Sequence, residues 1–288
     1  RVDRARWFGH NEPMTTALAL DRKQQRWDDA ATEAANLSEL YLAQGHIAKA
    51  VDYARESVIL ADQSADHSAR LESRSTLADA LHQHGDFVEA EELFREAEEI
   101  GVAWEPGLPI LYFPQGFLRC EFLITMGRCL EAQRRARSIL GQVTASGWLL
   151  DIGLAHLALG RASLAVAQAG ELAELAEAEQ HLNLAVEKTR EAGAQEELPR
   201  VLLARAEVER LTGGMERARR DVDDAMAIAI AANMRLNQAD GYLELARLHI
   251  VQGRRDLARQ SLHQAKEIIL DVGYHRRNRD VAAIEALM

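Results

Sequence analysis

Apolar residues recur at helical spacing along almost the whole chain, and short polar breaks divide them into pairs. In the segment NLSELYLAQGHIAKAV, residues 36–51, they lie three or four positions apart up to Gly45 and resume after it. Glycine commonly ends a helix because it adopts the left-handed backbone of a C-terminal cap. The pattern therefore predicts two antiparallel helices joined by a short turn.

This hairpin pattern occurs six times. Each first helix carries a small residue seven positions before a glycine: Ser38, Ala78, Cys120, Gly153, Ala206 and Ala246. Each second helix carries an alanine, at positions 50, 90, 132, 178, 218 and 258, so successive copies are 40, 42, 46, 40 and 40 residues apart. Helix axes approach within about 8–10 Å only where the facing side chains are small. We therefore expect these residues to be buried at helix–helix contacts.

The predicted architecture is a single all-α solenoid over residues 1–288, because each hairpin leaves an apolar face that the next one covers. A truncated helix (14–30, with Thr15 to Trp27 helical) precedes the hairpins, and Asn278 is expected to cap a final helix, 278–288. The predicted hairpins span residues 31–64, 71–103, 113–142, 147–193, 199–233 and 239–273.

Two segments depart from the simple repeat. The fourth copy has about a dozen extra residues after Gly160, so either its first helix continues to a turn near Gly170, which we favour, or a short separate helix follows a turn at Gly160. The proline-rich stretch from Trp104 to Gly116 cannot be continuous helix. We expect a loop there, with Trp104, Tyr112 and Phe113 either packed as a hydrophobic plug or in contact with a ligand.

The spacing small-x6-Gly-x4-Ala-x6-Ala resembles the tetratricopeptide repeat (TPR), although the usual period is about 34 residues. The segments NLSELYLAQG, STLADALHQHG, WLLDIGLAHLALGRA and MRLNQADGYLELARL resemble the TPR-like array at the C-terminal end of bacterial STAND NTPases of the NACHT or NB-ARC, NLR-like type. The resemblance covers roughly residues 30–280. It implies a right-handed stack in which first helices line a concave groove and second helices form the convex back.

Composition limits the possible partners. The 45 acidic and 34 basic residues give a formal charge of -11, which argues against general binding of nucleic acid. The longest uninterrupted apolar run, Ala225 to Ala232, is too short to span a membrane. Two cysteines and no signal segment favour a cytoplasmic location, and the chain begins at Arg1 rather than Met, so we expect a piece of a longer protein.

The sequence contains no motif for catalysis or for a cofactor. It lacks a Gly-rich phosphate loop, a GxSxG elbow and an HExxH helix. Cys120 and Cys129 are nine residues apart, which suits no zinc site, and Cys120 occupies a small helix-contact position. His156 follows a small position by three residues, where we expect a partly buried ring. We therefore predict a domain that is not an enzyme and holds no cofactor or metal.

In the register that the resemblance implies, the residue after each small position points into the groove. These residues are Glu39, Asp79, Glu121, Leu154, Glu207 and Arg247, a partly acidic row. Further groove positions are Leu42, His82, Phe117, Ile124, Leu203, Arg210 and Leu243. Acids beside exposed apolar residues would suit a basic and apolar peptide segment. The alternative is an ordinary solvated helix face.

Arginines cluster in or beside the second helices, at 134/135/137, 217/219/220 and 254/255. Neighbouring acids suggest ordinary ion pairs, with contacts to another domain of the parent chain as the alternative. The segment Tyr274 to Arg277 directly follows the last hairpin and is a candidate for a terminal docking contact.

The leading functional hypothesis is a monomeric, protein- or peptide-binding domain. The STAND resemblance implies that it is the ligand sensor of a larger signalling NTPase. A second hypothesis is a small-molecule sensor, because the array also resembles the sugar-sensing domain of a STAND transcription activator. Its site would then comprise the aromatic loop and Trp148. A third is a scaffold or oligomerisation module.

Overall fold

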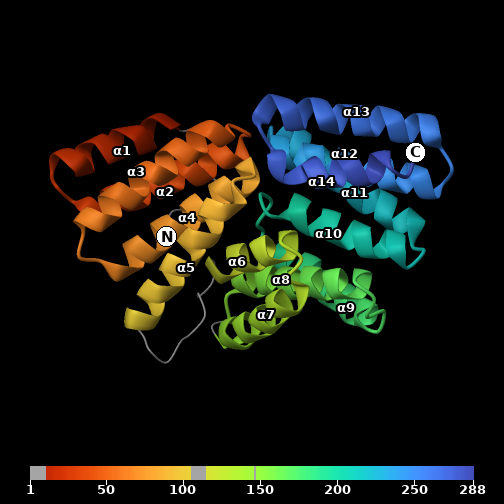
Figure 1. Ribbon diagram of the computed structural model, residues 1–288, viewed down its shortest axis with the longest axis horizontal. Helices are drawn as coiled ribbons and strands as arrows, with labels where there is room; N and C mark the ends of the chain where they lie inside the picture. Colours follow the sequence, from red (N-terminus) through yellow and green to blue (C-terminus); the bar gives the residue numbers. More distant parts are fainter. Residues whose placement is uncertain (1–10, 105–114, 146) are drawn as a thin grey trace. The chain divides into compact units, whose positions relative to one another are not determined.

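The computed structural model describes residues 11–104, 115–145 and 147–288. In these ranges the chain forms fourteen α-helices, one short 3-10 helix and no strand, which confirms the all-α prediction (Figure 1). The internal contacts divide the chain into two compact units. Unit 1 comprises Arg1–Arg119 and Val272–Arg276, and unit 2 comprises Cys120–Asp271 and Arg277–Met288.

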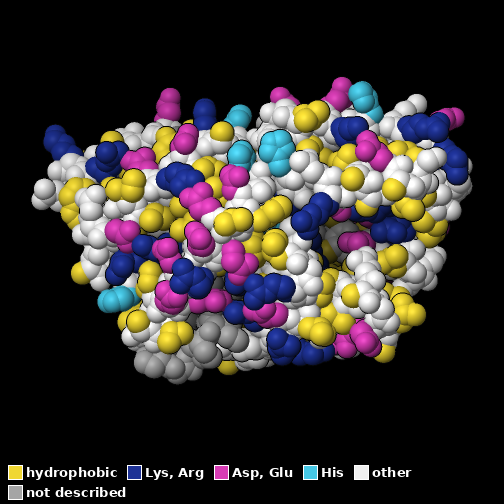
Figure 2. All heavy atoms as spheres, in the orientation of Figure 1, with side chains coloured by type: hydrophobic (Ala, Val, Ile, Leu, Met, Phe, Trp, Pro, Cys, Tyr) yellow, Lys and Arg dark blue, Asp and Glu magenta, His cyan; other side chains and the backbone are white. Residues whose placement is uncertain are grey.

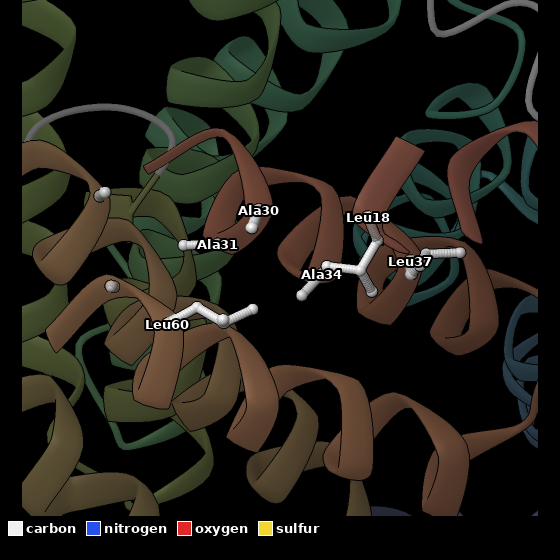
Figure 3. Close-up of a cluster of buried hydrophobic side chains, with 8 residues drawn as sticks. Leu18, Ala30, Ala31, Ala34, Leu37 and Leu60 are labelled. Carbon is white, nitrogen blue, oxygen red and sulfur yellow. The ribbon is translucent and has the colours of Figure 1, made fainter. Parts of the chain in front are cut away.

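Unit 1 contains two complete hairpins behind a single helix. Its helices are α1 (Asn11–Lys23), α2 (Trp27–Ala43), α3 (Ile47–Gln63), α4 (His67–His84), α5 (Phe87–Trp104) and the first part of α6 (Gln115–Thr125). Leucines from α1 and α3 enclose the small side chains of α2 in one buried cluster (Figure 3). The residues labelled there are Leu18, Ala30, Ala31, Ala34, Leu37 and Leu60. This cluster shows how alanines on one helix admit larger side chains from its neighbours.

Unit 2 contains the remaining hairpins and the final helix. Its elements are the end of α6, then α7 (Cys129–Thr144), α8 (Leu149–Gln168), α9 (Glu174–Glu191), α10 (Leu198–Leu211), α11 (Met215–Ala231), α12 (Arg235–Val251), α13 (Arg255–Val272) and α14 (Asn278–Glu285). The 3-10 helix His275–Arg277 leads into α14. The six hairpins begin and end within four residues of the predicted ranges.

The small residues lie where the sequence pattern placed them. All six in the first helices are buried, and the six matching alanines of the second helices are 0% exposed. Cys120 illustrates the contact, because its thiol donates to the carbonyl of Ala132 across the hairpin at 3.6 Å. Both cysteines are free. Side chains of this size let the paired helices approach closely, so this prediction is confirmed.

The fourth hairpin contains the longest helix of the described chain. α8 runs without interruption through Gly160, and the turn follows at Gly170, where φ is +124°. The continuous-helix interpretation is therefore confirmed. The reason lies in the packing, because an ideal Cβ at position 160 would lie 2.7 Å from Cγ of the fully buried Leu182 in α9. Only glycine permits that approach.

Two predictions about the ends of the chain are wrong. The first helix does not continue to Trp27, because Gln25 turns the chain with a φ of +56° and Trp27 begins α2 instead. Asn278 does not cap the last helix. The preceding 3-10 turn runs directly into α14, so Arg277 occupies the N-cap position without a side-chain cap bond, and α14 ends at Glu285.

The segment after the last hairpin contributes to both units. Tyr274 is buried, and Arg276 donates to Oε1 of Gln83 at 3.1 Å within unit 1. The ring of His275 meets that of His84 edge-on, with centroids 5.7 Å apart. The segment therefore contacts α4 of the same chain, and a docking contact with another domain stays a prediction.

Among the described residues, α8 is the one helix long and apolar enough to cross a membrane by length and composition. It contains charged residues at Asp151 and Arg161, and 61% of its most apolar window is buried inside the structure. Such burial is typical of the core helix of a helical bundle or repeat.

The contact between Gly160 and Leu182 gives a direct test of the packing. Gly160→Ala adds a methyl group within 3 Å of buried atoms. We expect it to lower the free energy of unfolding by about 1–2 kcal/mol, because the cost of overpacking exceeds the gain in helix propensity. Gly141→Ala is the control, because Gly141 is an exposed residue of α7 and an added Cβ there would have no atom within 4 Å. It should stabilise by up to about 1 kcal/mol. Urea unfolding followed by circular dichroism measures both, and equal effects would contradict the packing argument.

Candidate functional site

The residues predicted to line a groove all lie on the first helices of the hairpins: α2 and α4 in unit 1, α6 across the boundary, and α8, α10 and α12 in unit 2. We call the side chains at these positions the first-helix surface of each unit. The two surfaces are described separately. Whether a partner binds there stays a prediction.

In unit 1 this surface is half-buried and hydrogen-bonded. Glu39 and Leu42 of α2 are both half-buried. Asp79 of α4 accepts from Nε2 of Gln83 at 2.7 Å. His82 is fully buried, 4.0 Å from the Asp79 carboxylate, and therefore cannot serve as an open surface residue.

The start of α6 also turns inward. Phe117 is only 3% exposed, so the expectation of an exposed phenylalanine here is wrong. The neighbouring Arg119 is buried as well, donates to Glu91 of α5 at 2.7 Å, and lies 5.3 Å from the centre of the Phe94 ring. Burial of this arginine is possible because α5 supplies both a carboxylate and an aromatic face.

In unit 2, α8 connects the first-helix surface on either side of it. Leu154, Arg161 and Gln168 are spaced by seven residues and so share one face of the helix. Arg161 lies 2.8 Å from the carboxylate of Glu121 in α6, and Gln168 donates to Glu207 in α10 at 3.0 Å. The repeat pattern of the sequence did not indicate Arg161 and Gln168, although the small residue at 160 was a sign that the register continues along α8.

Beyond α10 the surface becomes a continuous row of alternating charges. Arg210 donates to Glu244 of α12 at 2.6 Å, and Glu244 also faces Arg247 at 3.3 Å. Arg247 in turn bonds to Asp280 of α14. Arg277 and Asp240 continue this row beyond Asp280. We call the six residues the charge ladder: Arg210, Glu244, Arg247, Asp280, Arg277 and Asp240.

The last pair of the charge ladder joins the 3-10 helix that precedes α14 to α12 through a bidentate contact. Arg277 donates to Asp240 through Nε at 2.7 Å and Nη2 at 2.8 Å, and it also reaches Asp280 at 3.2 Å. A guanidinium matches a carboxylate in this fork geometry better than an ammonium can. The ladder therefore orients the final helix on the last hairpin, a role that the sequence did not indicate.

Burial and charge act in opposite directions along the ladder. Burial raises the pKa of Glu244, and Arg210 and Arg247 only partly offset that effect. Burial also raises the pKa of Asp280, but Arg277 and Arg247 outweigh it and the net shift is downward. For Arg247 burial lowers the pKa, while Glu244 and other acids raise it further than burial lowers it. Each charge thus depends on its neighbours.

An acidic channel with exposed apolar residues is not what the structure contains. The acids are matched by basic or amide groups, as for Glu121 with Arg161 and Glu207 with Gln168. Leu154, Leu203 and Leu243 are buried, and Ile124 is half-buried. Figure 2 likewise shows acidic and basic side chains intermixed on the visible face. Neighbouring first helices bring charges of both signs together. The predicted acidic row used only one position in each repeat, and so it did not include the basic and amide partners.

The aromatic residues of the small-molecule hypothesis are only partly described. Trp104 ends α5, is 54% exposed and stacks on His67 with ring centroids 6.3 Å apart, so it is not tucked into the hairpins as expected. Tyr112 and Phe113 lie outside the described residues. Trp148 precedes α8 and is 45% exposed. Among the described residues, no group of three or more His, Cys, Asp or Glu is placed to hold a metal ion.

Two histidines form a pair between α8 and α9. The Nδ1 atoms of His156 and His181 are 2.9 Å apart, and the rings stack with centroids 5.0 Å apart. One ring must donate and the other accept, which requires at least one neutral imidazole. Burial lowers the pKa of His156 to about 4, with a further contribution from His181. Burial also lowers the pKa of His181.

Residues 28–101, which lie within α2–α5, match a family model of the tetratricopeptide repeat. Comparison with curated protein sequences gave no match. Among solved structures, a Rap protein complexed with Competence and Sporulation Factor has a TM-score of 0.62 at 14% identity, over 97% of this chain and 81% of that one. With the repeated hairpins, these findings identify the chain as a TPR-like solenoid.

A second solved structure places a similar fold in a larger assembly. It is a Signal Transduction ATPase with Numerous Domains (STAND) protein with a tetratricopeptide repeat sensor from Pyrococcus horikoshii, with a TM-score of 0.52 at 17% identity. The match covers 97% of this chain and 43% of that one, so this chain spans less than half of its length. Aspartyl phosphate phosphatase F from Bacillus subtilis matches at 13% identity, with a TM-score of 0.50 over 94% of this chain and 72% of that one. At these identities the likeness concerns the fold.

The charge ladder predicts a large effect of removing its central arginine. Arg247→Met leaves the buried carboxylate of Glu244 and the half-buried carboxylate of Asp280 without this partner, so we expect a loss of about 2–4 kcal/mol in the free energy of unfolding. Arg259→Met is the matched control, because its side chain is 59% exposed and its pair with Asp256 should contribute less than about 0.5 kcal/mol. Denaturant unfolding distinguishes the two, and similar losses would show that the ladder does not stabilise unit 2.

The histidine pair predicts loss of stability in acid. Both folded-state pKa values are depressed, so the pair favours folding above the unfolded value near 6.5, and that contribution disappears as the pH falls toward 4. His156→Gln with His181→Gln should remove about 1–2 kcal/mol of the fall in unfolding free energy between pH 6.5 and 4.5. His263→Gln, whose side chain is 68% exposed, should leave the pH profile unchanged. An identical profile for the double variant and the wild type would refute this account.

Proposed function

We propose that this chain is a non-catalytic domain that binds a protein or peptide segment through the first-helix surface, as the ligand sensor of a larger signalling or defence NTPase. The carrying observation is the placement of charged side chains on consecutive first helices, from Glu121 and Arg161 to Arg210 and Arg247. Repeat domains present such rows of side chains to extended ligands.

The geometry supports recognition of a segment with charges of both signs. Glu207 and Arg247 keep part of their surface accessible while their internal partners hold them in place. Side chains fixed in this way lose little conformational freedom on binding, which favours affinity. Alternating charge also penalises a partner in the wrong register, because like charges would then face each other.

The sensing role rests on the likeness to the STAND protein with a TPR sensor. A sensor acts when its ligand binds one state of the parent protein more tightly than the other and so shifts the population. Ligand bound across several hairpins would stabilise one arrangement of them. A reducing, cytoplasmic setting suits the two free cysteines of the chain.

The test selects peptides that bind the whole chain from a displayed library and measures affinity by calorimetry. Replacing Glu39, Asp79, Glu121 and Glu207 together with glutamine should weaken the selected peptides about tenfold or more while circular dichroism stays unchanged, because ionic contacts are lost and hydrogen bonding is kept. The control replaces four exposed acids of second helices with glutamine: Glu92, Glu99, Asp224 and Glu267.

Affinity equal in the two quadruple variants would exclude the first-helix surface as the binding site. The sensing role has a separate criterion, since a selected peptide should change nucleotide hydrolysis by the parent protein. A parent chain without a nucleotide-binding domain would exclude that role and leave peptide binding intact.

A further inference from the structure

The turn between α12 and α13 differs from the other arginine-containing segments. In each of the other two clusters two of three arginines form ion pairs, for example Arg219 with Asp223 at 2.9 Å, whereas Arg134 and Arg220 form none with a described residue. Arg254 and Arg255 are both exposed and form no ion pair with any described residue. The nearest acid in sequence, Asp256, is directed to Arg259 instead, at 3.2 Å. In a chain with a formal charge of -11, two adjacent unpaired arginines are unusual.

Apolar side chains lie on both sides of these arginines. Every residue from 251 to 257 is exposed, including Val251 at 54% and Leu257 at 41%. The backbone holds the turn in place, because the amide of Arg254 donates to the carbonyl of His249 at 2.8 Å. α13 begins at Arg255, so the positive end of an eighteen-residue helix lies at the same point.

A buried imidazole near the end of α12 senses the charge of this turn. His249 is 7% exposed, and its Nδ1 atom is buried and makes no hydrogen bond within the described chain. Burial lowers the pKa of His249, and the charges of Arg219 from α11 and Arg254 from the turn lower it further, while a hydrogen bond with Gln252 opposes them. The imidazole therefore reports on the charge at the turn, because the charge of Arg254 already acts on its pKa.

We propose that residues 249–257 form a docking site for an acidic, partly apolar segment of another protein. Its carboxylates would bind Arg254 and Arg255, and its apolar side chains would cover Val251 and Leu257. The exposed apolar residues and the negative charge of the whole chain disfavour a nucleic-acid strand. This site is separate from the first-helix surface, so neither proposal depends on the other.

The experiment uses the whole chain and a fluorescein-labelled synthetic peptide of sixteen residues. In this peptide, pairs of acidic residues (Glu or Asp) alternate with pairs of apolar residues (Leu and Phe). Fluorescence anisotropy at 0.1 M salt gives the affinity. Arg254→Gln with Arg255→Gln should weaken binding about tenfold, and Val251→Ser with Leu257→Ser by a similar factor. Arg134→Gln and Leu270→Ser are the matched controls, because Arg134 is an exposed, unpaired arginine of α7 and Leu270 is 71% exposed on α13. Both should bind within twofold of the wild type.

A second readout follows the imidazole itself. Bound carboxylates beside Arg254 should raise the pKa of His249, which is measured by NMR on histidine-labelled protein. Equal affinities for the arginine variant and Arg134→Gln would overturn the proposal, as would an unmoved pKa of His249. The proposal would also be overturned if inorganic phosphate raised the pKa of His249 and the peptide did not, because the site would then bind a free anion.

Discussion

The structure depends on the close approach of paired helices at small residues. Cys120 contacts the backbone of Ala132 across its hairpin, and at Gly160 no larger side chain fits without displacing Leu182. That spacing fixes how each second helix lies on its first helix, and therefore which faces remain for the next hairpin. Burial of the six small residues and their six alanine partners shows that the constraint applies throughout the described repeats.

Close packing also explains the electrostatics of the first helices. Helices lying side by side bring charged residues within bonding distance of one another, so each charge that loses water needs a partner. The ladder from Arg210 to Asp240 meets that need with alternating signs, and it anchors α14 through Asp280. A surface built in this way combines stability with a defined pattern of charge for recognition.

The two candidate binding regions differ in this respect. On the first-helix surface, carboxylates such as Glu121 have partners inside the chain, and a ligand must compete with or complement them. At the α12–α13 turn, Arg254 and Arg255 form no ion pair with any described residue. A ligand there would supply ionic contacts that the described part of the fold omits.

The sequence by itself determined the helical class, the six hairpins and the buried small residues, because these follow from local spacing and from the size of side chains such as Ala78. It also favoured the long α8 through Gly160. It did not determine which groove residues stay accessible, because exposure of Phe117 or pairing of Arg247 depends on side chains from other helices. Contacts between Arg247 and Asp280, 33 residues apart, arise only when the hairpins stack, and so the tertiary structure alone decided the charge pattern.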